Sequence, residues 1–104
     1  MRNLKYDWQH VENERCEYYK TDIGFDHLSV HMDKSAPNVW FGLLNGKIIF
    51  DKTKNDRVRK KYNLPHNCPM YNLPTIHFLT NADPQYMMRK VERYYAHGLL
   101  EISE

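Results

Sequence analysis

The residue types best suited to binding chemistry gather between positions 52 and 77 of this sequence. The segment opens with a basic run, Lys52, Lys54, Arg57, Arg59, Lys60 and Lys61, and the run ends at Tyr62. Lysine and arginine neutralise phosphates, and an aromatic ring can stack on a nucleotide base. Three more cations, Arg89, Lys90 and Arg93, follow near the C-terminus. If the two groups of cations share one surface, that surface could bind nucleic acid directly.

The same segment contains a tetrapeptide that occurs twice. Tyr62-Asn63-Leu64-Pro65 recurs nine residues later as Tyr71-Asn72-Leu73-Pro74. Each proline favours extended backbone for the leucine before it, and asparagine favours turns. Two interpretations stay open. The copies are either similar turns that attach a long loop to the fold, or a pair of exposed tyrosines that binds a ligand or partner.

Histidine and cysteine residues could bind a metal ion. His27 and His31 are four positions apart, and in a strand a rise of about 3.3 Å per residue separates them by about 13 Å. Zinc holds its ligands at about 2.0–2.3 Å, so this pair does not fit one ion. His66, Cys68 and His77, with a more distant ligand, stay open as another set. The sequence therefore predicts no metal ion and no other cofactor.

Catalytic signals are few. His27, His31 and His77, with lysine or tyrosine, could serve a metal-independent ribonuclease, in which histidines exchange protons and a cation stabilises the phosphate. The sequence contains no glycine-rich phosphate loop, nucleophile elbow or paired-carboxylate motif. A non-catalytic protein is therefore favoured, with the ribonuclease as an alternative.

The clearest local structure is a β-hairpin over residues 39–51. Asn45-Gly46 suits a two-residue turn because both positions need a positive φ. The resulting register pairs Leu43 with Ile48 and Phe41 with Phe50, and predicts that this apolar face is the core. The opposite face carries Trp40, Leu44 and Ile49. This face could contact a partner, or Trp40 could pack with Trp8 beneath an N-terminal helix.

Other elements follow from spacing and capping residues. Alternating apolar residues predict a strand over 27–33, and 76–79 reads as another short strand. Leu4, Trp8 and Val11 have helical spacing and predict an N-terminal helix over about 4–14.

A C-terminal helix over 84–97 has the clearest boundary signals. Asp83 is its N-cap, Pro84 its first residue, and Gly98 its left-handed end. The apolar stripe of this helix is Met87, Val91, Tyr94 and Tyr95. Because prolines interrupt regular structure, residues 52–75 should form a long loop with one short basic helical turn.

Together these elements predict an α+β fold. It comprises a small antiparallel sheet of three to four strands, with hairpin 39–51 central and a helix at each end of the chain. At 104 residues the chain is predicted to form a single domain, 1–104, and its modest core is compatible with a homodimer. No apolar run reaches the roughly 20 residues of a membrane span.

Composition constrains the setting and the partner. Two cysteines, Cys16 and Cys68, do not require a disulfide, so a cytoplasmic location is expected. Few alanines and many tyrosines are typical of an AT-rich genome or a phage-borne gene. Residues 1–51 carry six Lys or Arg against eight Asp or Glu, whereas residues 52–104 carry nine against five. The net charge of +2 excludes an acidic mimic of DNA.

These patterns favour a small cytoplasmic interaction protein, of adaptor or inhibitor type, that binds a protein partner which itself handles nucleic acid. Aromatic and arginine side chains dominate such interfaces. Direct binding of nucleic acid is the first alternative. The predicted contact residues are Arg57, Arg59, Lys60, Lys61, Tyr62, Tyr71, Arg89, Lys90, Arg93 and Trp40.

Overall fold

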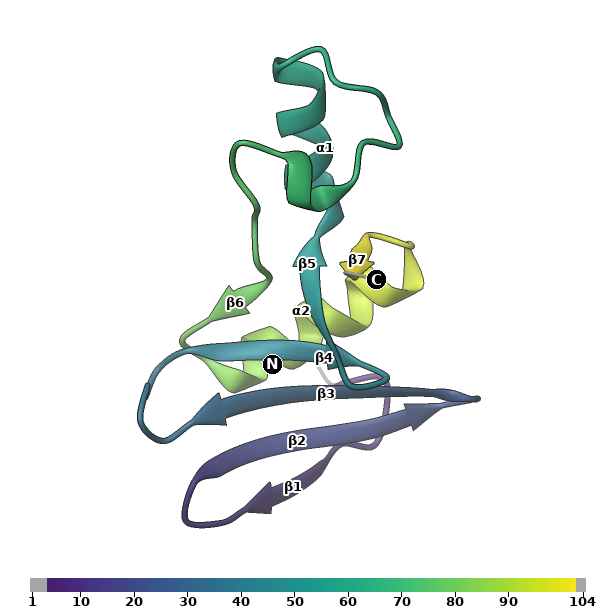
Figure 1. Ribbon diagram of the computed structural model, residues 1–104. Coiled ribbons are helices and arrows are strands. Elements are labelled where there is room, and N and C mark those ends of the chain that lie inside the picture. The colour runs from purple at the N-terminus through teal and green to yellow at the C-terminus, as the bar shows by residue number, and fades with distance from the viewer. Residues whose placement is uncertain (1–3, 103–104) are drawn as a thin grey trace.

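A computed structural model describes residues 4–102 (Figure 1). The fold is α+β, as predicted, with seven antiparallel strands and two α-helices. The elements are β1 (Gln9–Glu12), β2 (Cys16–Ile23), β3 (Asp26–Asp33), β4 (Trp40–Leu44), β5 (Lys47–Asp51), α1 (Lys52–Lys61), a 3-10 turn (Met70–Asn72), β6 (Thr80–Asn81), α2 (Pro84–Ala96) and β7 (Leu100–Ile102). The strand order is β1-β2-β3-β4-β5-β7, and β6 pairs with β4. The prediction of three to four strands was wrong.

The N-terminal helix was also a wrong prediction. Lys5 and Tyr6 each donate a backbone hydrogen bond to the Glu92 carboxylate, at 2.9 Å, and Trp8 Nε1 donates to it at 2.8 Å. Leu4 and Trp8 pack against the main core. The chain then enters β1, whose hydrogen bonds come from β2. A carboxylate more than 80 residues away therefore binds amides that a local helix would have used.

The hairpin turn is confirmed, but the predicted register extends too far. Asn45 and Gly46 have φ of 53° and 81°, and Leu43 pairs with Ile48. Phe41 does not pair with Phe50. Beyond the turn, β5 leaves β4 and pairs with β7, whereas β4 pairs with β6.

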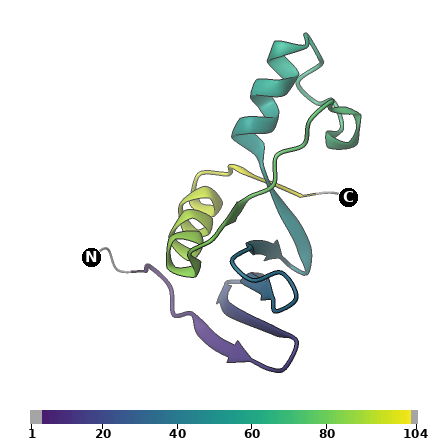
Figure 2. The same cartoon turned by 90° about the vertical axis from the view of Figure 1, so that its left-hand side faces the viewer.

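The predicted core face of this hairpin was wrong near the turn, although Phe50 of that face is buried in a second cluster. Ile48 is 41% exposed, whereas Trp40 is 4% exposed and Ile49 is fully buried. Helix α2 packs against β3 and β4 on the side of Trp40 (Figure 2). Gly42 of β4 lies at this contact, and a Cβ added to it would be 3.0 Å from Ile49 Cδ1. Glycine at position 42 therefore leaves the room that the Ile49 side chain of β5 occupies.

Helix α2 itself is confirmed at both ends. The Asp83 carboxylate accepts a hydrogen bond from Gln85 N at 3.0 Å. Gly98 has a φ of 67°, and Leu99 N donates to the Tyr94 carbonyl at 2.8 Å, the bond of a Schellman motif. The main core contains Leu28, Val30, Trp40, Ile49, Leu79, Met87, Met88 and Val91.

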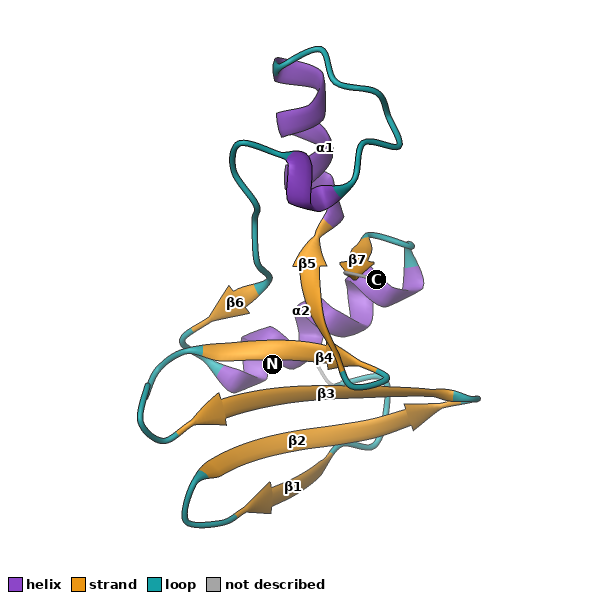
Figure 3. Cartoon of the chain, viewed as in Figure 1, coloured by secondary structure: helices purple, strands orange, loops and turns teal. Residues whose placement is uncertain are grey.

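A second, smaller cluster joins Phe50 of β5 to residues 52–77, which we name the α1 lobe. Its buried members are Phe50, Val58, Cys68, Met70 and Leu73. Helix α1 begins where β5 ends and extends away from the sheet (Figures 1 and 3). The ten-residue helix is longer than the single turn predicted, and it starts earlier, at Lys52.

Neither α-helix of residues 4–102 combines the length and apolar character that crossing a bilayer requires. Cys16 and Cys68 are both free thiols, and Cys68 is buried.

Candidate nucleic-acid interface on helix α1

Helix α1 is capped by its neighbours in sequence. The Asp51 carboxylate accepts a hydrogen bond from Lys54 N at 3.1 Å, which makes Asp51 the N-cap. At the other end, Asn63 has a φ of 55° and Leu64 N donates to the Arg59 carbonyl at 2.8 Å. This is the Schellman arrangement, with asparagine in the left-handed position. The first tetrapeptide copy is thus a helix terminus.

The second copy ends the 3-10 turn instead. Tyr71 and Asn72 lie within that turn, and Leu73 N donates to the Met70 carbonyl at 3.1 Å. Leu73 is buried, whereas Tyr71 is 64% exposed. In both copies the leucine packs on the second cluster, Leu64 only in part, and the tyrosine lies on the surface. Whether the tyrosines bind a ligand stays a prediction.

Two buried polar side chains hold α1 in place. Asn55 is fully buried; it donates to Glu101 Oε1 at 3.0 Å and accepts from His77 N at 2.8 Å. Arg59 is 4% exposed and donates to Glu101, Asp56 and the Cys68 carbonyl, at 2.6, 2.7 and 3.0 Å. Arg59 therefore has a structural role and does not present its charge to solvent.

This network also affects protonation. Burial alone would raise the pKa of Asp56, but hydrogen bonds from Lys52 and Arg59 outweigh it, and the pKa lies below its usual value. The hydrogen bonds to Glu101 raise the pKa of Arg59. Both groups therefore stay ionised at neutral pH, and the pair Arg59–Glu101 fastens α1 to β7.

The other cations of α1 remain available. Lys54, Arg57, Lys60 and Lys61 are exposed, and no carboxylate of residues 4–102 lies within 4.0 Å of them. Lys54, Arg57 and Lys61 occupy positions i, i+3 and i+7, one stripe of a helix. They line a hollow of about 340 Å³ together with Val58 and His77. Three cations and an imidazole thus surround one concave surface that has no acidic lining residue.

Tyr62 and Tyr71 do not lie together beside this surface. Tyr62 follows α1 directly, is 52% exposed, and has Lys61 Nζ 5.6 Å from its ring centre. Tyr71 lines a separate hollow of about 530 Å³ with Lys52, Arg59 and His66 among its neighbours. Only Tyr62 therefore lies next to the free cations, because it follows Lys61 in the chain and its ring lies near the Lys61 ammonium group.

The cations of α2 lie on another part of the molecule. Arg89 and Lys90 are half-buried and Arg93 is exposed; Lys90 and Arg93 lie 5.6 and 5.7 Å from the Tyr94 ring centre. Helix α2 packs along the sheet, whereas the last turn of α1 points away from it (Figures 1 and 2). The two helices therefore do not lie side by side.

Trp40, the predicted anchor for a protein partner, belongs to the main core. It is 4% exposed, and its ring centre is 5.8 Å from that of Tyr19. Trp8 packs against the same cluster, as one interpretation of the sequence proposed, but from an irregular segment.

The face of the sheet that points away from α2 holds a third group. Tyr18, His31 and Phe41 lie side by side on β2, β3 and β4, with ring centres 4.5 and 5.9 Å apart. Because the His31 ring lies between the other two rings, both of its faces are covered. Burial lowers the pKa of His31, so its imidazole is neutral at pH 7.

A hollow of about 650 Å³ lies beside this row. It is lined by Asp7, Gln9, Tyr18, Lys20, Thr21, Asp22, His27, Leu28, Ser29, His31 and Gly46. Asp22 Oδ1 is 2.5 Å from His27 Nδ1, and Ser29 Oγ is 3.0 Å from His31 Nε2. The two histidines and Lys20 therefore surround one concave site. His66, Cys68 and His77, within the described chain, do not converge on a point that could hold an ion.

Sequence analysis missed Lys54 and His77 as contact residues. Lys54 belongs to the basic run, and its helical spacing to Arg57 and Lys61 would have been visible once Asp51 was recognised as an N-cap. His77 has no local signal, because Asn55 brings it to α1 from 22 positions away.

No protein-family model, curated protein or solved structure matches this chain.

Proposed function

We propose that the α1 lobe binds nucleic acid through its backbone phosphates. The observation that supports this is the set of exposed cations on α1, Lys54, Arg57, Lys60 and Lys61, which no described carboxylate neutralises. Lysine and arginine gain binding free energy by releasing the counterions that surround phosphates. A fixed helix that presents several of them loses little conformational entropy when it binds.

The charge distribution supports the same proposal. Residues 52–77 contain six Lys or Arg and one Asp, a net charge of +5, whereas the rest of the chain has nine against twelve. A basic projection on an otherwise acidic molecule orients the protein towards a polyanion. Phosphate contacts position a protein but do not read bases. We therefore expect little sequence preference, and Tyr62 could add base stacking on single strands.

The test is a salt titration with a labelled single strand and the duplex of the same sequence. Each phosphate contact contributes about 0.7–0.9 to the slope of log affinity against log salt concentration. The double variant Arg57→Gln/Lys61→Gln should lower the slope by about 1.4–1.8. The matched control Arg15→Gln/Lys47→Gln removes the same charge from exposed positions outside the α1 lobe. Equal slopes for the two double variants would disprove the proposal.

Binding to a protein partner stays a prediction. Burial of Trp40 removes the residue on which that hypothesis most depended, but Tyr62 and Tyr71 are exposed. Affinity capture from a bacterial lysate, with one half treated with nuclease, separates the two cases. Protein bands that survive nuclease and are lost with Tyr62→Ala/Tyr71→Ala would indicate a protein partner. Recovered nucleic acid, with bands lost on digestion, would indicate direct phosphate contact.

One observation favours ribonuclease chemistry as a second candidate function. His27, oriented by Asp22, and neutral His31 line the same hollow as Lys20. One histidine could take the proton of a ribose 2′-hydroxyl while its oxygen attacks phosphorus. The other would give a proton to the departing 5′-oxygen, leaving a 2′,3′-cyclic phosphate.

Cleavage of an RNA oligonucleotide in the presence of a chelator tests this second candidate. His27→Ala and His31→Ala should each abolish cleavage, whereas the exposed His97→Ala should not. Wild-type protein that leaves RNA intact would remove the ribonuclease hypothesis but not the proposal of phosphate binding.

A further inference from the structure

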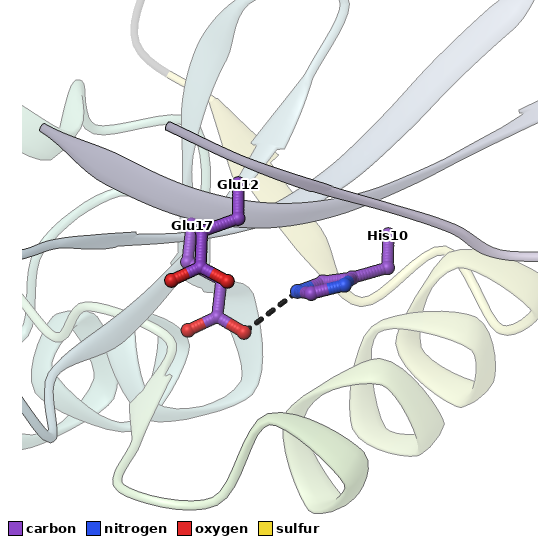
Figure 4. A group of neighbouring side chains, drawn as sticks. All are labelled: His10, Glu12 and Glu17. Carbon is purple, nitrogen blue, oxygen red and sulfur yellow. Dashed lines mark hydrogen bonds and ion pairs between the residues drawn. The ribbon is translucent and has the colours of Figure 1, made fainter. Parts of the chain in front are cut away.

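One imidazole and two carboxylates meet on the β1–β2 hairpin (Figure 4), at the opposite end of the molecule from the α1 lobe (Figure 1). They belong to His10 and Glu12 on β1 and to Glu17 on β2. One ligand atom from each lies within 4.8 Å of the others, and no other group of three such residues in the described chain does so. We propose that this hairpin binds a divalent transition-metal ion of the zinc type.

The hairpin backbone places the three side chains together. Successive strand residues point to opposite faces, so His10 and Glu12 share a face. Glu12 pairs directly with Glu17 across the two strands, and His10 pairs with Tyr19. The His10 ring stacks on the Tyr19 ring, with centres 4.7 Å apart. The donor atoms are thus positioned by strand register, and a metal ion would not have to organise a loop.

The register also places two negative side chains directly opposite each other, an arrangement that a bound cation would stabilise. Like charges directly opposite each other in an antiparallel pair destabilise the sheet, and Glu12 and Glu17 are such a pair. In the protein alone, His10 Nε2 lies 2.7 Å from Glu17 Oε2, and Lys34 Nζ lies 2.7 Å from Glu12 Oε2. A divalent ion would neutralise both carboxylates at once and take the place of the contact between His10 and Glu17.

The donor set selects the class of metal. Imidazole suits zinc and similar transition metals, whereas calcium and magnesium prefer oxygen ligands alone. Zinc holds nitrogen and oxygen ligands at about 2.0–2.2 Å, which places the donor atoms roughly 3.5 Å from one another. The 2.7 Å contact between His10 and Glu17 would therefore open, and wider separations within the group would close. Three protein ligands leave a coordination position for water or another ligand.

Lys34 makes the proposal specific. Its ammonium group lies 2.7 Å from Glu12 Oε2, so it competes with a metal ion for that carboxylate and repels the ion. Removing the ammonium group should therefore strengthen metal binding, whereas a lysine with only a structural role would leave the affinity unchanged.

The test is a competition titration of Zn²⁺ against a chromophoric chelator at pH 7.5, with the full chain kept reduced. We expect one ion per chain, with affinity at least tenfold weaker in His10→Ala and in Glu17→Gln, and at least threefold tighter in Lys34→Gln. His97→Ala, which removes an exposed histidine outside the hairpin, should bind as the wild type does. Circular dichroism without metal checks that each variant is folded.

Two results would overturn the proposal. One is a wild-type chain that binds no Zn²⁺ under these conditions. The other is binding that His10→Ala and Glu17→Gln leave unchanged, which would assign the ion to ligands outside this hairpin. Neither result bears on the α1 lobe, because the salt titration uses different residues.

Discussion

Arg59 shows how one position in a basic run can differ from its neighbours. Its side chain is 4% exposed and contacts two carboxylates and a carbonyl. Arg57, two residues earlier, is exposed on the same helix. The difference follows from helix geometry, because positions two apart point in different directions. The buried guanidinium binds Glu101 of β7, and the exposed one is free for a partner.

Arg59→Gln should destabilise the protein by about 2–3 kcal/mol, because it removes the positive charge beside Glu101 and leaves Glu101 Oε2 and the Cys68 carbonyl without the hydrogen bonds that Arg59 donates. The partly exposed carboxylates keep the loss below that of a fully buried pair. Urea denaturation measures the change in the free energy of unfolding. Arg57→Gln, the matched control, should change it by less than about 0.5 kcal/mol. Equal effects of the two substitutions would contradict the structural role assigned to Arg59.

His31 should make stability depend on pH. Burial lowers the pKa of His31 in the folded chain below its usual 6.5, so the unfolded chain binds the proton more readily. The contribution of His31 to stability is therefore complete above pH 6.5 and is lost as pH falls below that value. Melting temperatures between pH 8 and 5 should fall less in His31→Phe than in the wild type. A His97→Gln control should retain the wild-type profile.

At the scale of elements, the N-terminal segment depends on α2. Glu92 is buried, and its carboxylate accepts hydrogen bonds from Lys5 N, Tyr6 N and Trp8 Nε1. One carboxylate thus orients the chain before β1. This contact replaces the helix that the spacing of Leu4 and Trp8 would otherwise favour.

Glu92→Ala should release this segment from α2. Hydrogen bonds to a charged group contribute about 1.5–3 kcal/mol each, so we expect tryptic cleavage after Lys5 to become at least about tenfold faster. Mass spectrometry of timed digests measures that rate. Cleavage after the exposed Lys61 should stay unchanged in the same samples. An unchanged rate after Lys5 would show that the segment is held by other contacts.

The two tetrapeptide copies provide an internal comparison of helix ends. Asn63 has a φ of 55°, whereas Asn72 does not have a positive φ. A β-branched residue in the left-handed region costs roughly 1–2 kcal/mol. Asn63→Val should therefore destabilise the α1 lobe by about that amount, and Asn63→Gly should not. Asn72→Val is the control, and a thermal melt that ranks it with Asn63→Val would contradict this assignment.

At the scale of the whole molecule, the buried residues form two separate clusters. The main core joins the sheet to α2, and the second joins Phe50 of β5 to the α1 lobe. Arg59 and Asn55 connect the lobe to Glu101 of β7. A small cluster with few connections opens more readily than a larger one.

Hydrogen exchange should reveal this difference. Amides of α1 should exchange through local opening, at a free energy below that of β3 and α2, whose amides should require global unfolding. Arg59→Gln destabilises the native state relative to both the locally opened and the globally unfolded states, so it should speed exchange in the α1 lobe and in β3, with α1 still exchanging faster than β3. Uniform protection across α1, β3 and α2 would show that the molecule unfolds as a single unit.

What the sequence determined by itself was local. Asn45-Gly46 specified the turn, Asp83 and Gly98 specified the ends of α2, and the alternation in 27–33 specified β3. These signals are reliable because turns, caps and strand periodicity depend on residues close together in the chain. The basic character of α1 was visible for the same reason.

Burial and ion pairing, in contrast, depended on residues far apart in the chain. Which hairpin face is buried depended on α2, and the fate of residues 4–8 depended on Glu92. Arg59 is not part of the candidate site because it is buried against Glu101, and His77 is part of it because Asn55 accepts a hydrogen bond from its backbone. Burial and ion pairing are set by residues tens of positions apart, and no local pattern encodes which of them meet.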